Sequence, residues 1–162
     1  MKVLISNVKT GLKEVAIISI LKKSEIPMKK NGWNFNWKKL YLVEGSITYK
    51  LSLQDSLGIV EGLIMLTIIN GEMVYMNNVE LAPHNLGSNR AYNNVAGCLM
   101  AFACRESFEK GKNEYKGFLS FDSKTELIDL YQKKYGATHA MGQKLFFDPN
   151  AGKVMIQKYL QL

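Results

Sequence analysis

Residues 79–99, VELAPHNLGSNRAYNNVAGCL, combine the features of an anion-binding site. A strand is predicted to end before Pro83, a polar and glycine-containing loop follows, and a helix rich in small residues begins near Asn94. This order brings several free backbone N–H groups and the positive end of a helix to one position. Such a group of donors suits an anionic ligand such as a pyrophosphate.

The composition predicts one globular domain, residues 1–162, with room for a sizeable core. Apolar residues make up 47% of the chain and charged residues 22%, which excludes an intrinsically disordered chain. The net charge of +7 favours an anionic partner, whether a nucleic acid, a phosphorylated cofactor or an acidic substrate. Charge alone does not choose among the three.

The sequence also predicts a cytoplasmic protein that does not span a membrane. No apolar run reaches the roughly 18 residues that a transmembrane helix requires. The start, MKVLISNVKTGLKEV, lacks the apolar region and the cleavage site of an export signal. Cys98 and Cys104, six residues apart on a predicted helix, point to different faces and are expected to stay reduced.

The first quarter of the chain is expected to form a strand, a helix and a loop. The strand is predicted at residues 1–8, and residues 14–26 have the pattern of an amphipathic helix that Pro27 ends. Residues 28–39, MKKNGWNFNWKK, alternate aromatic residues with asparagines around a glycine. They are interpreted either as a loop whose aromatic rings cap the core or as a flexible lip over a substrate cleft.

Three strands are predicted next. The alternating pattern of residues 40–53 indicates a strand, and the continuous apolar run of residues 58–69 indicates one that is covered on both faces. Asn70-Gly71 separates this run from a third strand at residues 72–81. Because an Asn-Gly pair between apolar runs is a strong hairpin signal, we expect the last two strands to pair antiparallel.

A helix at residues 94–110 is apolar nearly all round, which predicts that it is buried inside the domain. Gly97 costs this helix roughly 1 kcal/mol relative to alanine, so a packing or ligand reason for it is expected. A strand at residues 115–121 follows. The strand–helix–strand order from residue 74 to residue 121 predicts one parallel step in the sheet.

The last elements are predicted to be a helix, a short strand and a terminal helix. Ser123 is a candidate N-cap for the first helix, and Gly136 a candidate for its end. The strand is expected at residues 144–147, and Asn150 is a candidate cap for the terminal helix.

At residues 40–147 the chain resembles the GNAT superfamily of coenzyme A-dependent acyltransferases. The resemblance rests on the strands before the loop, the slender helix, the strand after it, and a helix that carries Tyr131 before a glycine. The tripeptide Pro83-His84-Asn85 is similar to that of a bacterial branch with a longer phosphate loop. The resemblance implies an α/β (α+β) fold with a mixed central sheet, mostly antiparallel with one splayed parallel pair, flanked by helices.

The same resemblance implies acetyl-CoA or coenzyme A as the cofactor. In such enzymes pantetheine enters between the two splayed strands, and the pyrophosphate binds N–H groups of the loop and the helix. Against the family's loop pattern Ala96 fits its position, Asn94 replaces the first glycine, and Arg90 is a displaced basic residue. The residues implied to bind the cofactor are Leu81, Ala82, Arg90, Tyr92, Asn93, Asn94, Val95, Ala96 and Gly97.

Acyl transfer to an amine needs a base, an oxyanion donor and an acid. Glu80 is the candidate base by its position on the strand, and a solvated or ion-paired carboxylate is the alternative. The backbone N–H of Leu81 or Ala82 would stabilise the oxyanion. Tyr131 is the counterpart of the family's acid, with half-buried packing as the alternative, because five positions rather than four separate it from Gly136.

No metal site is expected, because no Cys, Asp or Glu at ligand spacing accompanies His84 or His139. Asn85 is expected to hold the loop through a local Asx-type hydrogen bond rather than to take part in the chemistry.

The leading hypothesis is an N-acetyltransferase that moves the acetyl group directly to a small-molecule or peptide amine, with a homodimer left open. No Cys–His or Ser–His–Asp arrangement indicates a covalent intermediate. One alternative is a GNAT-like binding protein whose altered loop holds coenzyme A poorly. The other is a basic nucleic-acid-binding module, based on the charge and on Trp33, Phe35 and Trp37. It ranks last because aromatic residues in one loop do not form a recognised RNA motif.

Overall fold

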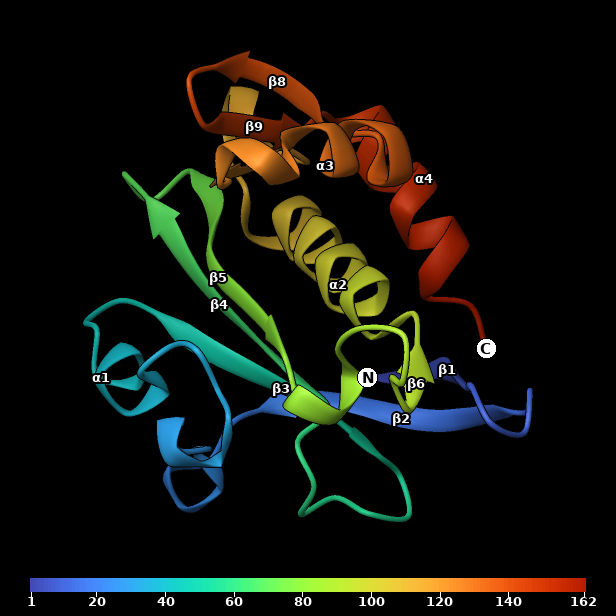
Figure 1. Ribbon diagram of the computed structural model, residues 1–162. Helices are drawn as coiled ribbons and strands as arrows, with labels where there is room; N and C mark the ends of the chain where they lie inside the picture. Colours follow the sequence, from blue (N-terminus) through green and yellow to red (C-terminus); the bar gives the residue numbers. More distant parts are fainter.

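The computed structural model describes all 162 residues, which form a nine-stranded mixed sheet with helices on both faces (Figure 1). The strand order is β6-β1-β2-β3-β4-β5-β7-β9-β8. The strands are β1 (Lys2–Asn7), β2 (Lys13–Ile20), β3 (Ile47–Leu53), β4 (Gly62–Ile69), β5 (Met73–Leu81), β6 (Tyr92–Asn93), β7 (Leu119–Asp122), β8 (Thr138–Met141) and β9 (Lys144–Phe147). The helices are α1 (Trp37–Tyr41), α2 (Val95–Lys110), α3 (Ile128–Tyr135) and α4 (Pro149–Tyr159).

Every neighbouring pair of strands is antiparallel except β5 and β7, which are parallel. The predicted fold class, a mostly antiparallel mixed sheet with one parallel pair and flanking helices, is therefore confirmed. None of the helices combines the length and the apolar character that a membrane crossing requires.

The β4–β5 hairpin turns at the predicted Asn-Gly pair. Asn70 has φ 53° and Gly71 has φ 71°, so both central residues are left-handed, as a type I′ turn requires. The continuous apolar run before the turn is covered on both faces, as predicted. Ile64 contributes to the main core under α2, while Leu63 and Met65 contribute to a smaller core on the opposite face.

Strands β5 and β7 pair over only three residues and then part. The register runs from Val74 opposite Leu119 to Met76 opposite Phe121, whereas β5 continues to Leu81. At the point of parting, the register of β5 against β4 shifts, and Asn77 becomes an extra residue. A bulge of this kind bends and twists its strand, which is a physical cause for the separation. The splayed parallel pair that the resemblance implied is present.

Helix α2 is buried nearly all round up to Cys104, as its composition predicts, and its last turns reach the surface. Its first half needs small residues because α4 lies directly against it (Figure 1). A Cβ on Gly97 would lie 2.4 to 2.7 Å from ring atoms of Tyr159, which is closer than carbon atoms can approach. The predicted packing reason for Gly97 is therefore the Tyr159 ring.

The smaller core lies between the sheet and the segment that contains α1. Trp33 and Trp37 are buried there with Leu63, Met65 and Ala82. Of the two interpretations of residues 28–39, the structure therefore supports the loop whose aromatic rings cap the core. The same burial removes both tryptophans from the surface, where base stacking would need them.

The predicted helix at residues 14–26 is wrong. Strand β2 occupies Lys13–Ile20 and pairs with β1 on one side and β3 on the other. Ala16 and Ile18 are buried at a spacing of two, which is the strand period, and β-branched residues dominate this stretch. Because alternation and helical spacing overlap in so short a segment, the pairing partners decided the outcome.

Several predicted element ends also shift. Strand β3 begins at Ile47, since the residues before it complete α1 and a turn. Ser123 does not cap α3, which begins five residues later, although Gly136 does end it with φ 81°. Asp148, not Asn150, caps α4 by accepting a hydrogen bond from the Ala151 N–H at 2.8 Å.

Strand β8 was not predicted from the sequence, because all of its residues are exposed and show no apolar pattern.

Both cysteines are free and buried. No group of three or more His, Cys, Asp or Glu side chains gathers where it could hold a metal ion.

The contact between α2 and α4 gives a first prediction. Gly97→Ala should destabilise the protein by about 1–3 kcal/mol, because overpacking against Tyr159 outweighs the helix propensity that alanine gains. In a Tyr159→Ala background the same change should be neutral or stabilising by up to about 1 kcal/mol. Urea unfolding of the four proteins measures both values. An equal cost in the two backgrounds would contradict the packing explanation.

Candidate functional site

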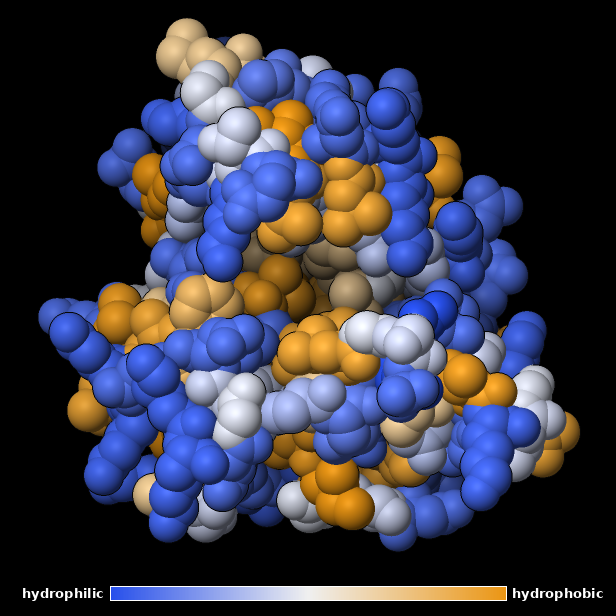
Figure 2. Space-filling model, in the orientation of Figure 1, coloured by the Kyte–Doolittle hydropathy of each residue, from blue (hydrophilic) through white to orange (hydrophobic).

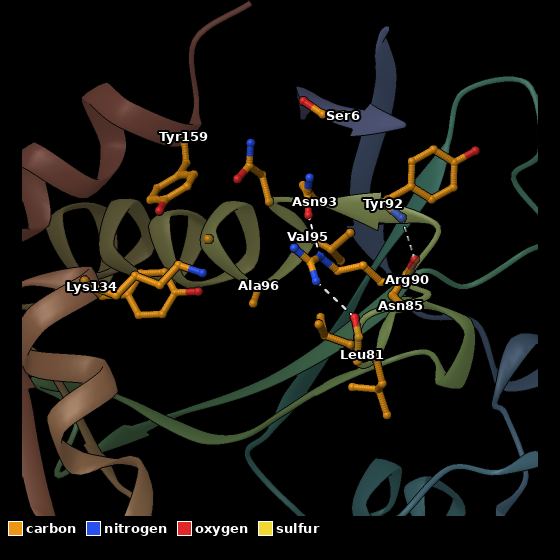
Figure 3. Close-up of a pocket in the computed structure, with 15 residues that line it drawn as sticks. Ser6, Leu81, Asn85, Arg90, Tyr92, Asn93, Val95, Ala96, Lys134 and Tyr159 are labelled. Atoms are coloured by element: carbon orange, nitrogen blue, oxygen red, sulfur yellow. Dashed lines mark hydrogen bonds between the residues drawn. The ribbon is translucent and has the colours of Figure 1, made fainter. Parts of the chain in front are cut away.

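A cavity of about 630 Å³ opens where β5 ends and α2 begins (Figure 3). It lies on the side of the sheet that carries α2, between the loop after β5 and the end of α3. Figure 2 shows the molecule hollowed between its two halves, with apolar side chains at the margins of the hollow. The residues that line the cavity are Ser6, Leu81, Asn85, Leu86, Gly87, Arg90, Tyr92, Asn93, Asn94, Val95, Ala96, Gly97, Lys134, Tyr135 and Tyr159.

The cavity contains all but one of the residues that the resemblance implied for the cofactor. The exception is Ala82, which is 1% exposed and packs in the smaller core. Its N–H donates to the carbonyl oxygen of Glu61 at 3.0 Å. Ala82 therefore offers a ligand neither exposed surface nor a free backbone N–H, and it lies outside the cavity that the other eight residues line.

Leu81 supplies the donor that Ala82 lacks. In an antiparallel ladder, consecutive residues turn their N–H groups alternately toward and away from the partner strand. Since the Ala82 N–H bonds to Glu61, the residue just before β4, this alternation turns the N–H of Leu81 away from β4, toward the side on which β5 has left β7. By this alternation the Leu81 N–H faces the gap between the splayed strands.

The N-terminus of α2 supplies further donors. Val95, Ala96 and Gly97 occupy the first turn, whose N–H groups have no partner within the helix, and all three line the cavity. Asn94 precedes them with φ 73° and ψ 6°, a left-handed conformation that glycine adopts most readily. Asparagine tolerates this conformation better than most residues, so the turn survives the substitution.

Two cations face each other across the cavity (Figure 3). Arg90 extends from the loop, where its guanidinium donates to Asn93 Oδ1 at 2.5 Å and to the Gly87 carbonyl at 3.0 Å. Lys134 enters from α3 on the other side. No carboxylate lines the cavity. Together with the helix N-terminus, these charges make the cavity a site for an anion.

The sequence analysis missed Lys134. Its place beside the glycine that ends α3 was the available signal, because this helix end belongs to the part of the chain that carries the resemblance.

The loop between β5 and β6 is held by a buried acid that the sequence analysis overlooked. Glu61 is 2% exposed, and its Oε2 accepts from Asn85 Nδ2 at 2.7 Å and lies 2.5 Å from His84 Nε2. Asn85 Oδ1 accepts from the Tyr92 N–H at 3.1 Å. Asn85 thus holds the loop as expected, but through residues distant in sequence rather than through a local Asx-type bond. An acid within an otherwise apolar run was the signal for Glu61.

The two tyrosines of α3 occupy different places. Tyr131 packs edge-on against Phe121 of β7, with ring centroids 5.0 Å apart, and does not line the cavity. Tyr135, one turn further along, lines the cavity beside Tyr159. Burial raises the pKa of Tyr131 above its ordinary value. Burial, together with the neighbouring hydroxyls of Tyr159 and Tyr131, raises the pKa of Tyr135 to about 12.

Glu80 lies on the opposite face of the sheet from the cavity. Its carboxylate accepts hydrogen bonds from the N–H groups of Asn34 at 2.6 Å and Phe35 at 3.1 Å, and from Trp37 Nε1 at 2.8 Å. These three contacts anchor the α1 segment to β5 and agree with a structural role for this carboxylate.

Comparisons with known proteins agree with this geometry at the level of the fold. No protein-family model and no curated protein sequence matches the chain. Among solved structures, AtaTR bound with AcCoA has a TM-score of 0.62 at 16% identity, over 86% of this chain and 97% of that chain. AtaT complexed with acetyl-methionyl-tRNAfMet has a TM-score of 0.62 at 13% identity, over 86% and 98%. A GNAT family acetyltransferase from Elizabethkingia anophelis with acetyl-CoA bound has a TM-score of 0.56 at 16% identity, over 78% of each chain.

The protein therefore has the GNAT acetyltransferase fold. The splayed strands, the donors at the start of α2 and the cavity between them occupy one region of that fold.

The raised pKa of Tyr135 gives a second prediction. Between pH 10, where an unfolded tyrosine titrates, and about pH 12, the folded protein keeps this proton while the unfolded chain loses it. The free energy of unfolding therefore falls as the pH rises through this window. It should fall less in Tyr135→Phe than in the unchanged protein. Urea unfolding at a series of pH values measures the difference, and absorbance at ~295 nm should show one fewer late-titrating tyrosine. Equal losses in both proteins would contradict the burial of the Tyr135 hydroxyl.

Proposed function

We propose that this protein is an N-acetyltransferase that binds acetyl-CoA in the cavity and transfers the acetyl group directly to an amine. The observation that carries the proposal is the cavity itself, which joins the end of β5, where it has parted from β7, to the anion site at the start of α2. A pantetheine arm fits a gap between strands, and a pyrophosphate fits a helix N-terminus with Arg90 and Lys134 beside it.

In the proposed reaction the amine attacks the thioester carbonyl and forms a tetrahedral intermediate. The N–H of Leu81 would donate to the oxyanion, and a tyrosine hydroxyl would protonate the departing thiolate. Tyr135 is our candidate for this acid, because it lines the cavity and its pKa of about 12 keeps it protonated at neutral pH. The sequence-based candidate, Tyr131, lies one turn away and is the comparison to make.

No base contributes to this scheme. Neither a carboxylate nor an imidazole lines the cavity, and the carboxylate of Glu80 is occupied by three donors. The acceptor would therefore arrive as a neutral amine or lose its proton to water. Small-molecule and peptide amines are candidates. One solved protein of the same fold is complexed with acetyl-methionyl-tRNAfMet, which adds an aminoacyl-tRNA amine to them.

The alternative is a binding protein of the same fold without catalysis, and the departure of the loop from the family pattern at Asn94 is the feature in its favour. The left-handed backbone of Asn94 weakens this alternative, because the turn that the pattern's glycine forms is kept.

The role of Asn94 gives a third prediction. Asn94→Gly should bind acetyl-CoA at least as tightly as the unchanged protein, because glycine adopts a positive φ without strain. Asn94→Val should bind about tenfold or more weakly, because a left-handed β-branched residue costs on the order of 1–2 kcal/mol. Isothermal titration calorimetry with acetyl-CoA measures both affinities.

Asn113 provides the matched control, since it is also left-handed, with φ 54°, but lies outside the cavity. Asn113→Val should reduce stability and leave the affinity for acetyl-CoA unchanged. An absence of binding to the unchanged protein at millimolar acetyl-CoA would contradict the proposed function.

The two tyrosines give a fourth prediction. With the best acceptor from a panel of primary amines, Tyr135→Phe should lower kcat by about 10²–10⁴-fold and leave the affinity for acetyl-CoA unchanged. Tyr131→Phe should change kcat much less, since its hydroxyl does not reach the cavity. Release of the coenzyme A thiol measures the rates. A larger loss of kcat in Tyr131→Phe than in Tyr135→Phe would instead identify Tyr131 as the acid.

A further inference from the structure

The acceptor amine needs its own route to the acyl group. Two cations, Arg90 and Lys134, line the cavity, and the positive end of α2 adds to them. An amine that arrives as an ammonium ion is repelled by these charges. The other face of the sheet, which we call the far face because it is turned away from α2, offers the alternative route to a thioester held between β5 and β7.

Side-chain alternation identifies the residues of the far face beside the gap. In β7, in β9 and in the first half of β5, every second residue contributes to the main core under α2, so the residues between them point to the far face. These are Met73 and Tyr75 of β5, Ser120 and Asp122 of β7, and Lys144 and Phe146 of β9. The registers place Ser120 between Tyr75 and Phe146, so a small side chain lies between two large ones.

A groove of about 350 Å³ lies on this face. Its lining residues are Met73, Glu114, Tyr115, Phe118, Ser120 and Phe146. The ring centroids of Phe118 and Phe146 are 6.1 Å apart. Asp122 lies two residues beyond Ser120, roughly 7 Å along β7, at the point where β7 parts from β5. We call the groove, together with Tyr75 and Asp122, the far-face trough.

Asp122 ends this trough with a negative charge that no cation neutralises. Its exposed carboxylate accepts a hydrogen bond from the Tyr75 hydroxyl and forms no ion pair, although Lys144 lies opposite it in the register of β7 and β9. Burial, together with the contact to Asp122, raises the pKa of Tyr75 to about 12, so this hydroxyl remains a donor at neutral pH. The contact occupies one carboxylate oxygen and leaves the other for an ammonium group.

A second unused acceptor lies at the same level of the sheet. Asn77 follows Met76 as Asp122 follows Phe121, and Met76 and Phe121 are the last pair of the parallel register. The side-chain Oδ1 of Asn77 is buried and has no hydrogen-bond partner. A buried acceptor without a partner is costly, and a ligand N–H would relieve this cost. An ammonium group carries three N–H donors, enough for both side chains.

We propose that the far-face trough binds the acceptor, and that the acceptor is a small primary amine with an apolar or aromatic body. Its ammonium group would lie at Asp122, and its body against Met73, Phe118 and Phe146. The inference rests on the proposed function, because it names the acceptor of that reaction. The four residues from Phe118 to Asp122 span roughly 13 Å, which suits one ring on a short linker.

The charges of the trough favour this occupant over an anionic one. Glu114 within the groove and Asp122 at its end attract cations, in a protein whose net charge is +7. Apart from Glu114 and Ser120, the lining of the groove is apolar or aromatic. The bound ammonium group would lose its proton to water at this exposed edge before the amine attacks. Asp122 would therefore bind and orient the acceptor without acting as a base.

The first test uses ligands that each lack one half of the proposed acceptor. Ethylamine keeps the ammonium group without the ring, and phenethyl alcohol keeps the ring without the charge. Isothermal titration calorimetry in the presence of coenzyme A should show that phenethylamine binds about tenfold or more tightly than either. Equal binding of phenethylamine and ethylamine, or tighter binding of spermidine than of phenethylamine, would overturn the inference.

The second test removes the charge or the space of the trough, and release of the coenzyme A thiol measures the rates. Asp122→Asn should raise the KM for phenethylamine about tenfold or more and change kcat little, because it removes an ion pair that forms on binding. Asp55→Asn is the matched control, since Asp55 is exposed between β3 and β4 and loses the same charge. Ser120→Leu should fill the groove and raise the KM for phenethylamine more than the KM for ethylamine.

The affinity for acetyl-CoA should be unchanged in all three variants. If acetyl-CoA binds and amines are acetylated, but Asp122→Asn and Asp55→Asn have the same KM for phenethylamine, the inference is overturned while the proposed function stands. If phenethylamine binding depends on Asp122 in a protein that does not bind acetyl-CoA, the proposed function is overturned and the amine site remains.

Discussion

Strand β5 has a neighbour on both sides for its first half and on one side for its second half, and the site depends on this change. Up to Met76 its backbone bonds are shared between β4 and β7. Beyond the extra residue Asn77, the groups that face β7 lose their partners, and the N–H of Leu81 is one of them. A backbone donor without a partner in a covered place is costly unless a ligand or water satisfies it. The separation of β5 from β7 therefore creates the gap and also leaves backbone groups without partners facing it.

Two separate sets of contacts hold the elements on either side of the gap. On the α2 side, α4 lies against the slender first half of α2, and Tyr159 occupies the space that Gly97 leaves. On the other side, Glu80 ties the α1 segment to the free half of β5 through three hydrogen bonds. Glu61 then fixes the loop that follows. The two polar anchors are acids, Glu80 within β5 and Glu61 just before β4, and neither lines the cavity that they help to shape.

Local patterns predicted the parts of the fold whose signals lie within a few residues. The left-handed pair Asn70-Gly71 needed no tertiary contact to identify the hairpin, and the all-round apolar surface of α2 predicted its burial. The resemblance added the cofactor residues around Asn94, all but one of which line the cavity. Ala82 lies outside the cavity, because the direction of its N–H depends on the register with β4, which no pattern in its own segment reports. The helix predicted at residues 14–26 is wrong for a related reason. This short segment fits a period of 2 as well as a period of 3.6, and pairing with β1 and β3 makes it the strand β2.

The sequence by itself determined the Asn70-Gly71 turn, the buried helix, the charge excess and the order of elements that produces one parallel step. Each of these follows from the conformational preference or the polarity of consecutive residues. Only the tertiary structure decided which tyrosine of α3 faces the cavity, that Lys134 joins Arg90, and that Glu80 serves as an anchor. One residue along a helix rotates a side chain by about 100°, so a spacing of five rather than four before Gly136 left the aim of Tyr131 open. The packing of Tyr131 against Phe121 settled its direction and left Tyr135 at the cavity.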